Sequence, residues 1–153
     1  MRRPPRLAWA LVLLAAAGTA PAQTLTNTGA LSFGSFTAGA GGSVTVSAGG
    51  ARSKAGSVIL VNQGTSAAAA QFTVSGTPSA MFDITLPADG TVFLSDGASG
   101  SMALNNFISS PATSGMLSGG GTLTVSVGAT LTVGNAQTPG SYSGSFNVTV
   151  NYQ

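Results

Sequence analysis

Residues 141–152 alternate without a break between two kinds of side chain. Every second residue from Tyr142 to Tyr152 is aromatic, aliphatic or glycine, and the residues between them are serine, asparagine or threonine. A period of two is the pattern of a β-strand that buries one face, whereas an amphipathic helix repeats every three to four residues. Shorter runs of the same kind recur from position 30 onward. The sequence therefore predicts an all-β fold.

Turn-forming residues separate these runs. The chain holds 22 glycines and 7 prolines, many of them in clusters with Ala, Asn and Asp. Asp-Gly pairs begin at Asp89 and Asp96, and such pairs are typical of tight turns because both residues tolerate a positive φ. About ten short strands at regular spacing predict a β-sandwich. The predicted strands are 30–36, 43–47, 57–61, 71–75, 81–86, 91–94, 102–108, 122–127, 130–133 and 141–152.

The first 22 residues have the three parts of a secretory signal peptide. Three arginines come first, an apolar run follows over residues 7–17, and small residues end at Ala22. The run of 11 residues is too short to cross a bilayer as a helix, which takes about 20. We therefore expect cleavage after Ala22, export through the inner membrane, and a single sandwich domain over residues 23–153 without a transmembrane span.

Loss of this leader changes the charge of the protein. It removes three of the five cations and leaves Arg52 and Lys54 against three aspartates, a net charge of −1. A basic surface for nucleic acid is thereby excluded. Arg52 and Lys54 lie among glycines in residues 49–56, which predicts a solvated loop. The alternative interpretation of the two cations is contact with an acidic glycan.

The side chains that most enzyme sites need are missing. The chain has no histidine, no cysteine and no glutamate, which excludes serine and cysteine triads and the common zinc and iron sites. The three acids are Asp83, Asp89 and Asp96. We interpret them as turn and surface residues rather than as a catalytic pair or a calcium site. We expect a protein that is not an enzyme and that holds no metal and no cofactor.

The C-terminal alternation has a specific spacing. Counted from the last residue, Tyr152 is second, Val150 fourth, Val148 sixth, Phe146 eighth and Gly140 fourteenth. These positions resemble the last strand of the chaperone-usher pilins. Farther upstream, LSFGSF is similar to the first-strand motif of the spore-coat-U-like branch of archaic pilins. Together with AGAGGSVTVS and TLTVGN, these motifs are closer still to a little-characterised family of exported Gram-negative domains related to those pilins.

The resemblance covers nearly the whole chain after the leader, and it implies an immunoglobulin-like sandwich that lacks its last strand. An apolar groove then lies beside the final strand, and another chain fills it by β-strand addition. The implied partners are a periplasmic chaperone, an outer-membrane usher, and copies of the chain or related subunits. The implied location is the periplasm, then the cell surface or an extracellular fibre. The residues that the resemblance assigns to chaperone and donor-strand contact are Gly140, Phe146, Val148, Val150 and Tyr152.

Two alternatives stay open at this point. The N-terminal arm, residues 23–29, offers only Leu25 as an apolar anchor, so the chain either accepts a strand without giving one or completes its own sandwich. The competing function to a fimbrial or surface-coat subunit is a self-contained secreted sandwich that binds carbohydrate or another surface ligand. A processed chain with two tyrosines and no tryptophan offers few stacking platforms for sugars, which disfavours that function.

Overall fold

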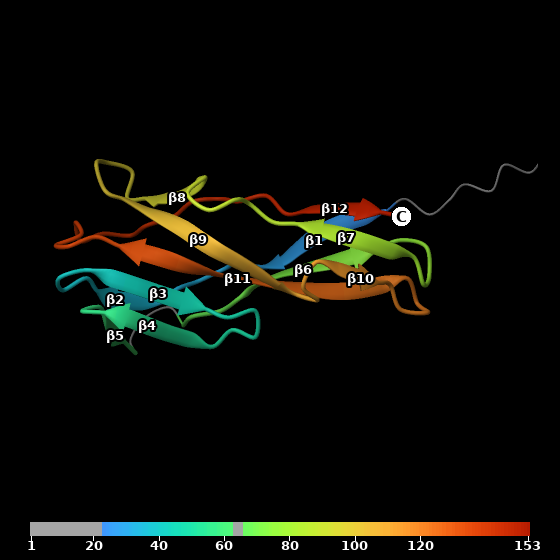
Figure 1. Ribbon diagram of the computed structural model, residues 1–153, viewed down its shortest axis with the longest axis horizontal. Coiled ribbons are helices and arrows are strands. Elements are labelled where there is room, and N and C mark those ends of the chain that lie inside the picture. The colour runs from blue at the N-terminus through green and yellow to red at the C-terminus, as the bar shows by residue number, and fades with distance from the viewer. Residues whose placement is uncertain (1–22, 63–65) are drawn as a thin grey trace, which may run out of the picture.

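The computed structural model describes residues 23–62 and 66–153, and the expected signal peptide lies outside the described residues. The described residues form antiparallel strands and loops, with no helix that could cross a membrane. The strands, shown in Figure 1, are β1 (Thr24–Gly29), β2 (Ser35–Thr37), β3 (Gly42–Val46), β4 (Arg52–Gly56), β5 (Ile59–Val61), β6 (Ala70–Ser75), β7 (Met81–Thr85), β8 (Val92–Ser95), β9 (Ser101–Ser110), β10 (Ser114–Met116), β11 (Thr122–Val133) and β12 (Thr149–Tyr152).

The larger sheet is built around β11. Along one edge, the first half of β11 pairs with β6 and the second half pairs with β3, while β9 pairs along the opposite edge. Strand β1 extends the sheet beyond β6, β4 extends it beyond β3, and β8 extends it beyond β9. Gly128 lies where β6 gives way to β3, and a Cβ atom there would stand 2.1 Å from the carbonyl oxygen of Val46. Only glycine allows this approach of two backbones.

The second layer is a sheet in the order β10-β7-β12. Pairing and chain order together match an immunoglobulin sandwich: β1, β6, β11 and β9 take the places of strands A, B, E and D, and β7 and β12 those of C and F. In that fold a seventh strand, G, pairs with F. Within residues 23–62 and 66–153, no strand pairs with the outer edge of β12. The all-β sandwich predicted from the sequence is confirmed.

The core consists of two clusters of apolar side chains, one toward each end of the elongated molecule (Figure 1). The first cluster includes Val44, Met102 and Leu131, from β3, β9 and β11. The second lies between the two layers and joins Phe72 of β6 to Phe82 of β7. The half-buried side chains of Leu31 and Phe107 contact both clusters. The two clusters therefore meet at the middle of the molecule.

Several predicted strand boundaries are wrong. The ranges 122–127 and 130–133 form one strand, β11, because Gly128 continues the ladder instead of turning. The range 141–152 is a regular strand only in β12. The predicted solvated loop over 49–56 is wrong for residues 52–56, which form β4 and pair with β3 along their length. Polar strands β1 and β10 were missed, and the expected strand 30–36 is reduced to an isolated bridge and the beginning of β2.

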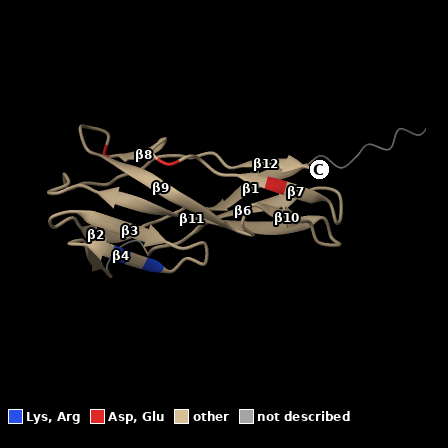
Figure 2. Cartoon of the chain, viewed as in Figure 1, with Lys and Arg blue, Asp and Glu red and all other residues tan. Residues whose placement is uncertain are grey.

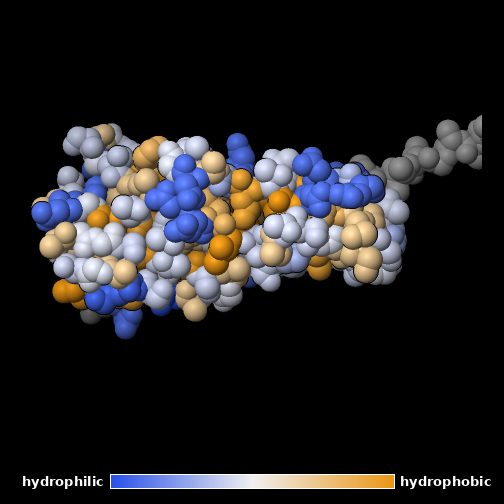
Figure 3. Space-filling view, in the orientation of Figure 1, coloured by the Kyte–Doolittle hydropathy of each residue, from blue (hydrophilic) through white to orange (hydrophobic). Residues whose placement is uncertain are grey.

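Charge is sparse on this fold. Within the described residues, Figure 2 shows the two basic side chains, Arg52 and Lys54, together on β4 and the three aspartates spread along the opposite side of the molecule. Most of the face in Figure 3 has a pale colour of intermediate hydropathy, and hydrophobic surface gathers near its middle. Electrostatic forces therefore contribute little to the attraction between this surface and a partner.

Candidate binding groove

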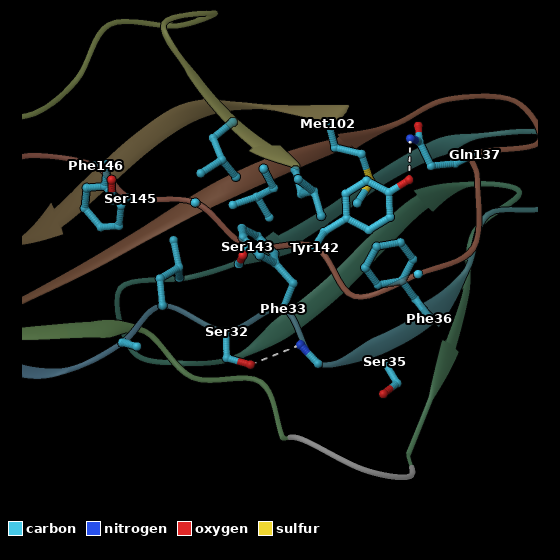
Figure 4. A pocket seen from close by; sticks show the side chains of 18 of the residues that line it. Ser32, Phe33, Ser35, Phe36, Met102, Gln137, Tyr142, Ser143, Ser145 and Phe146 are labelled. Atoms are coloured by element: carbon cyan, nitrogen blue, oxygen red, sulfur yellow. Dashed lines mark hydrogen bonds between the residues drawn. The ribbon is translucent and has the colours of Figure 1, made fainter. Parts of the chain in front are cut away.

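An apolar groove of about 750 Å³ opens between the N-terminal and C-terminal parts of the chain. One wall is residues 27–38, which lead from the end of β1 through β2, and the other wall is residues 137–146, which precede β12. We call these the N-terminal wall and the C-terminal wall. The groove runs between the two core clusters, and Figure 4 shows Phe146 at one end and Tyr142 with Phe36 at the other.

The floor of the groove is made of core side chains, which are buried except for the half-buried Leu94. Strands β6, β8, β9 and β11 contribute Ala70, Phe72, Leu94, Met102, Leu104 and Leu131 to it. None of the described residues that line the groove is charged. An apolar floor of this kind favours apolar side chains of an occupant.

The C-terminal wall carries an unpaired stretch of backbone. Ser143 forms an isolated bridge with Ser95, and pairing resumes at Thr149 with Thr85. Nine residues lie between Thr85 and Ser95, whereas five lie between Ser143 and Thr149. The extra residues between Thr85 and Ser95 form an excursion that contains Pro87 and the turn at Asp89 and Gly90. Among the described residues, the segment 144–148 therefore makes no backbone hydrogen bond to another strand.

A smaller hollow of about 390 Å³ lies between this segment and the excursion. Its lining includes Leu86, Pro87 and Asn147. The segment 144–148 thus stands between two hollows, and the side chains of Phe146 and Val148 pack against the second cluster. The Phe146 ring makes two aromatic contacts. That ring lies 5.2 Å from the ring of Phe107 and 6.4 Å from the ring of Phe72, centre to centre. Aromatic contact here replaces a strand ladder.

Beyond the groove, the apolar face of the C-terminal segment continues onto the second cluster. Val148, Val150 and Tyr152 are half-buried and pack against it. The Tyr152 hydroxyl donates a hydrogen bond of 3.2 Å to the carbonyl oxygen of Ser75. Burial also raises the pKa of the Tyr152 phenol above its ordinary value. The alternation over 142–152 therefore has the orientation expected from the sequence, but its apolar face stays partly open.

The N-terminal wall is held by a few contacts. Ser32 and Ala68 exchange two backbone hydrogen bonds of 2.8 and 2.9 Å, and Phe33 is buried in the first cluster. Strand β2 then pairs with β5 over three residues. The Arg52 side chain of β4 donates hydrogen bonds to the carbonyl oxygens of Phe33 and Ser35, both at 3.0 Å.

Tyr142 closes one end of the groove. Its hydroxyl donates a hydrogen bond of 2.6 Å to the carbonyl oxygen of Thr138. The side-chain amide of Gln137 donates to the Tyr142 hydroxyl at 3.0 Å and to the carbonyl oxygen of Ser101 at 3.1 Å. Figure 4 shows the Tyr142 ring beside Met102 and Phe36. These contacts fix the C-terminal wall where it enters the groove.

Comparison with known proteins identifies a family for this chain. The sequence model of a family described as a domain of unknown function, DUF4402, matches residues 24–152. The chain belongs to this family. The DUF4402 match includes β1, both walls of the groove and β12. Searches of curated proteins and of solved structures found no match.

The residues that the resemblance singled out occupy three places in this DUF4402 domain. Gly140 and Phe146 line the groove. Val148, Val150 and Tyr152 continue the same face over the second cluster, outside the groove. Leu25 lies on β1 opposite Val74 of β6 and is 36% exposed. In the N-terminal wall the sequence predicted a strand over residues 30–36, but it did not indicate how that segment is held, because its alignment depends on Ser32 and Arg52 meeting distant backbone groups.

The three aspartates of the DUF4402 domain have local structural partners. Asp96 accepts hydrogen bonds from the backbone of Ala98 and Gly100, and Asp89 accepts one of 2.7 Å from the backbone of Asn106. Asp83 lies exposed on β7 and accepts from the Gln153 side chain. Within the described ranges, no three acidic side chains come together as metal ligands. Their interpretation as turn and surface residues agrees with these contacts.

Proposed function

We propose that this chain is an exported, non-catalytic structural subunit of a fimbria or surface coat, and that it assembles by donor-strand exchange. In this function, an extended segment of another polypeptide enters the groove and becomes the missing seventh strand of the sandwich. A periplasmic chaperone supplies that segment first, and a neighbouring subunit supplies it later, at an outer-membrane usher. The subunit then resides at the cell surface.

The observation that carries the proposal is the unpaired backbone of 144–148 beside an apolar groove. A strand laid along this segment would gain main-chain hydrogen bonds, and its alternate side chains would cover the floor residues. A small molecule would use the apolar floor but would leave the backbone groups of the wall unpaired. The combination of a free edge and an apolar floor therefore favours a β-strand as occupant over a compact ligand.

Strand β1 is a poor donor, so we assign the chain the role of acceptor. Its residues pair with β6 inside the same molecule, and most of them are exposed. Leu25 is its one large apolar side chain. A donor for this groove needs several apolar side chains in alternation, because the floor extends from Phe72 to Leu131. The donor therefore comes from a chaperone or from a different subunit.

The test uses the protein purified after export, with and without a peptide of about ten residues that alternates valine and threonine. We expect the protein alone to self-associate, because an open strand edge promotes aggregation. The peptide should give a single monomeric peak in size-exclusion chromatography and raise the melting temperature. A peptide of the same composition with its valines in one block is the control, and it should do neither.

Two matched double substitutions test which face of the C-terminal segment export and assembly require. Val148→Thr with Val150→Thr keeps the shape of two inward side chains but makes them polar, and should impair export and assembly. Asn147→Thr with Asn151→Thr changes the outward face of the same segment and should leave both unchanged. A sharp, reversible unfolding transition of a monomer that ignores the peptide would instead establish a self-contained secreted binding module.

A further inference from the structure

Arg52 forms a four-point clamp between β4, the N-terminal wall and the end of β5. Its Nη1 atom donates to the carbonyl oxygens of Phe33 and Ser35, both at 3.0 Å. Its Nη2 atom donates to the carbonyl oxygen of Val61 and to the side-chain oxygen of Asn62, both at 3.2 Å. One side chain thus joins three segments that are separate in sequence.

This geometry requires arginine. The guanidinium is a planar fork with five N–H donors, whereas a lysine ammonium is a compact charge on a flexible stem. Lys54 provides the contrast within the same strand, two residues farther along and on the same face. Lys54 is exposed, and no hydrogen bond or ion pair involves it in the part of the chain that the structure describes. Of the two cations on β4, only Arg52 is a structural clamp.

The pair of strands β2 and β5 needs the support that the Arg52 hydrogen bonds provide. Strands β2 and β5 pair with each other over three residues and with no other strand in the described residues. A two-stranded sheet of this size is marginal by itself. Ser35 and Phe36 of β2 also line the groove, so any outward movement of the β2–β5 pair widens it. The clamp therefore acts on the spacing between the two walls.

We propose that Arg52 is a positioning residue that holds the N-terminal wall at the separation at which the groove accepts a strand. This inference rests on the proposed function, since it concerns the affinity of the groove for a donor. Arg52 itself does not touch the donor. It acts through the backbone of residues 33–35, whose carbonyl oxygens it fixes from behind.

The experiment compares Arg52→Met with Lys54→Met, using the alternating valine-threonine peptide as the probe and isothermal titration as the readout. Arg52→Met should weaken binding about tenfold, because clamp hydrogen bonds are lost and the wall must be ordered anew on binding. Lys54→Met, which removes the same charge from the same face, should bind like the unmodified protein. Arg52→Lys keeps the charge without the fork and should resemble Arg52→Met.

Hydrogen exchange without peptide separates positioning from general destabilisation. In Arg52→Met, faster exchange should be confined to β2 and β5, with β6 and the first half of β11 unchanged. If Arg52→Met does not fold, Asn62→Ala removes one of the four acceptors and should weaken peptide binding about twofold. Unchanged peptide affinity in a folded Arg52→Met variant, or exchange that rises uniformly, would overturn the inference alone. Failure of the unmodified protein to bind the peptide would overturn the proposed function with it.

Discussion

Strand β11 and the C-terminal segment 141–152 have the same sequence pattern and different surroundings. Both alternate apolar and hydroxyl or amide side chains over about twelve residues. β11 has β6 and β3 along one edge and β9 along the other, and Val125 and Val127 are fully buried. The C-terminal segment is paired only at Ser143 and in β12, and its apolar side chains are half-buried.

The difference separates two kinds of information in an alternating sequence. The period of two specifies which face of a strand is apolar, because successive side chains point to opposite sides. It does not specify how many neighbours the strand has, because backbone hydrogen bonds are the same for every residue except proline. An apolar face without enough neighbours is therefore where a partner strand gains most. Each of the following experiments tests this contrast.

The largest expected effect comes from a charge on the inner face. Val127→Asp places a carboxylate in a fully buried site without a partner, and should cost about 4 kcal/mol or more, enough to prevent folding. Val148→Asp puts the same group on the half-open segment, where water reaches it, and should cost about 1 kcal/mol. Circular dichroism and urea unfolding measure both. Equal losses would show that the C-terminal segment is as enclosed as β11.

A single added methyl group should give the next largest effect. In Gly128→Ala the new Cβ meets the backbone of Val46 and Ser47, which are fixed in the sheet, so we expect a loss of about 3 kcal/mol. In Gly144→Ala the new Cβ meets the carbonyl oxygen of Phe93 at 2.5 Å. The segment that follows has no ladder and can shift, so about 1 kcal/mol is expected. A greater loss of stability in Gly144→Ala than in Gly128→Ala would contradict the contrast between β11 and the C-terminal segment.

Hydrogen exchange of backbone amides tests the difference in strand pairing between β11 and the C-terminal segment. Amides in the middle of β11 should exchange at least about a hundredfold more slowly than those of residues 144–148, because only the former lie in a two-sided ladder. Addition of the alternating valine-threonine peptide should slow exchange in 144–148 and leave β11 unchanged. Protection of 144–148 without peptide would show that this edge is already satisfied.

How far the sequence predicts this molecule depends on which force holds each element. Alternation located β3, β6, β7 and β9, whose inward side chains enter the core. It missed β1, because TLTNTG has one large apolar residue and the strand is held by backbone hydrogen bonds to β6. Alternation also predicted two strands in place of β11, because a glycine that allows close backbone approach, such as Gly128, has the same local sequence signal as a turn glycine.

The C-terminal wall of the groove was predicted more closely than the N-terminal wall, where the sequence predicted a strand over residues 30–36 but not what holds it. Gly140 and Phe146 were located from their spacing to the C-terminus, and both line the groove. The opposite wall is held by Arg52 through backbone carbonyl oxygens of residues far away in sequence. Carbonyl groups carry no residue-specific signal, so Arg52 was interpreted as part of a solvated loop. Contacts from a side chain to distant backbone become visible only when the fold is known.

The smallest expected effect concerns Tyr152, where the C-terminal segment is best anchored. Its phenol has a raised pKa in the folded state because burial disfavours the charged form, so the folded protein holds this proton more tightly than the unfolded chain. The contribution to stability is complete below about pH 10 and is lost as the pH rises through the folded-state pKa. Tyr152→Phe should cost about 0.5 kcal/mol at neutral pH through loss of the hydrogen bond to Ser75. It should also flatten the alkaline fall in the free energy of unfolding, measured by urea titration between neutral pH and pH 11 or so. If the two proteins lose stability in parallel above pH 10, Tyr152 is as solvated as the open part of the segment, and the anchoring of β12 has to be assigned to its pairing with β7 alone.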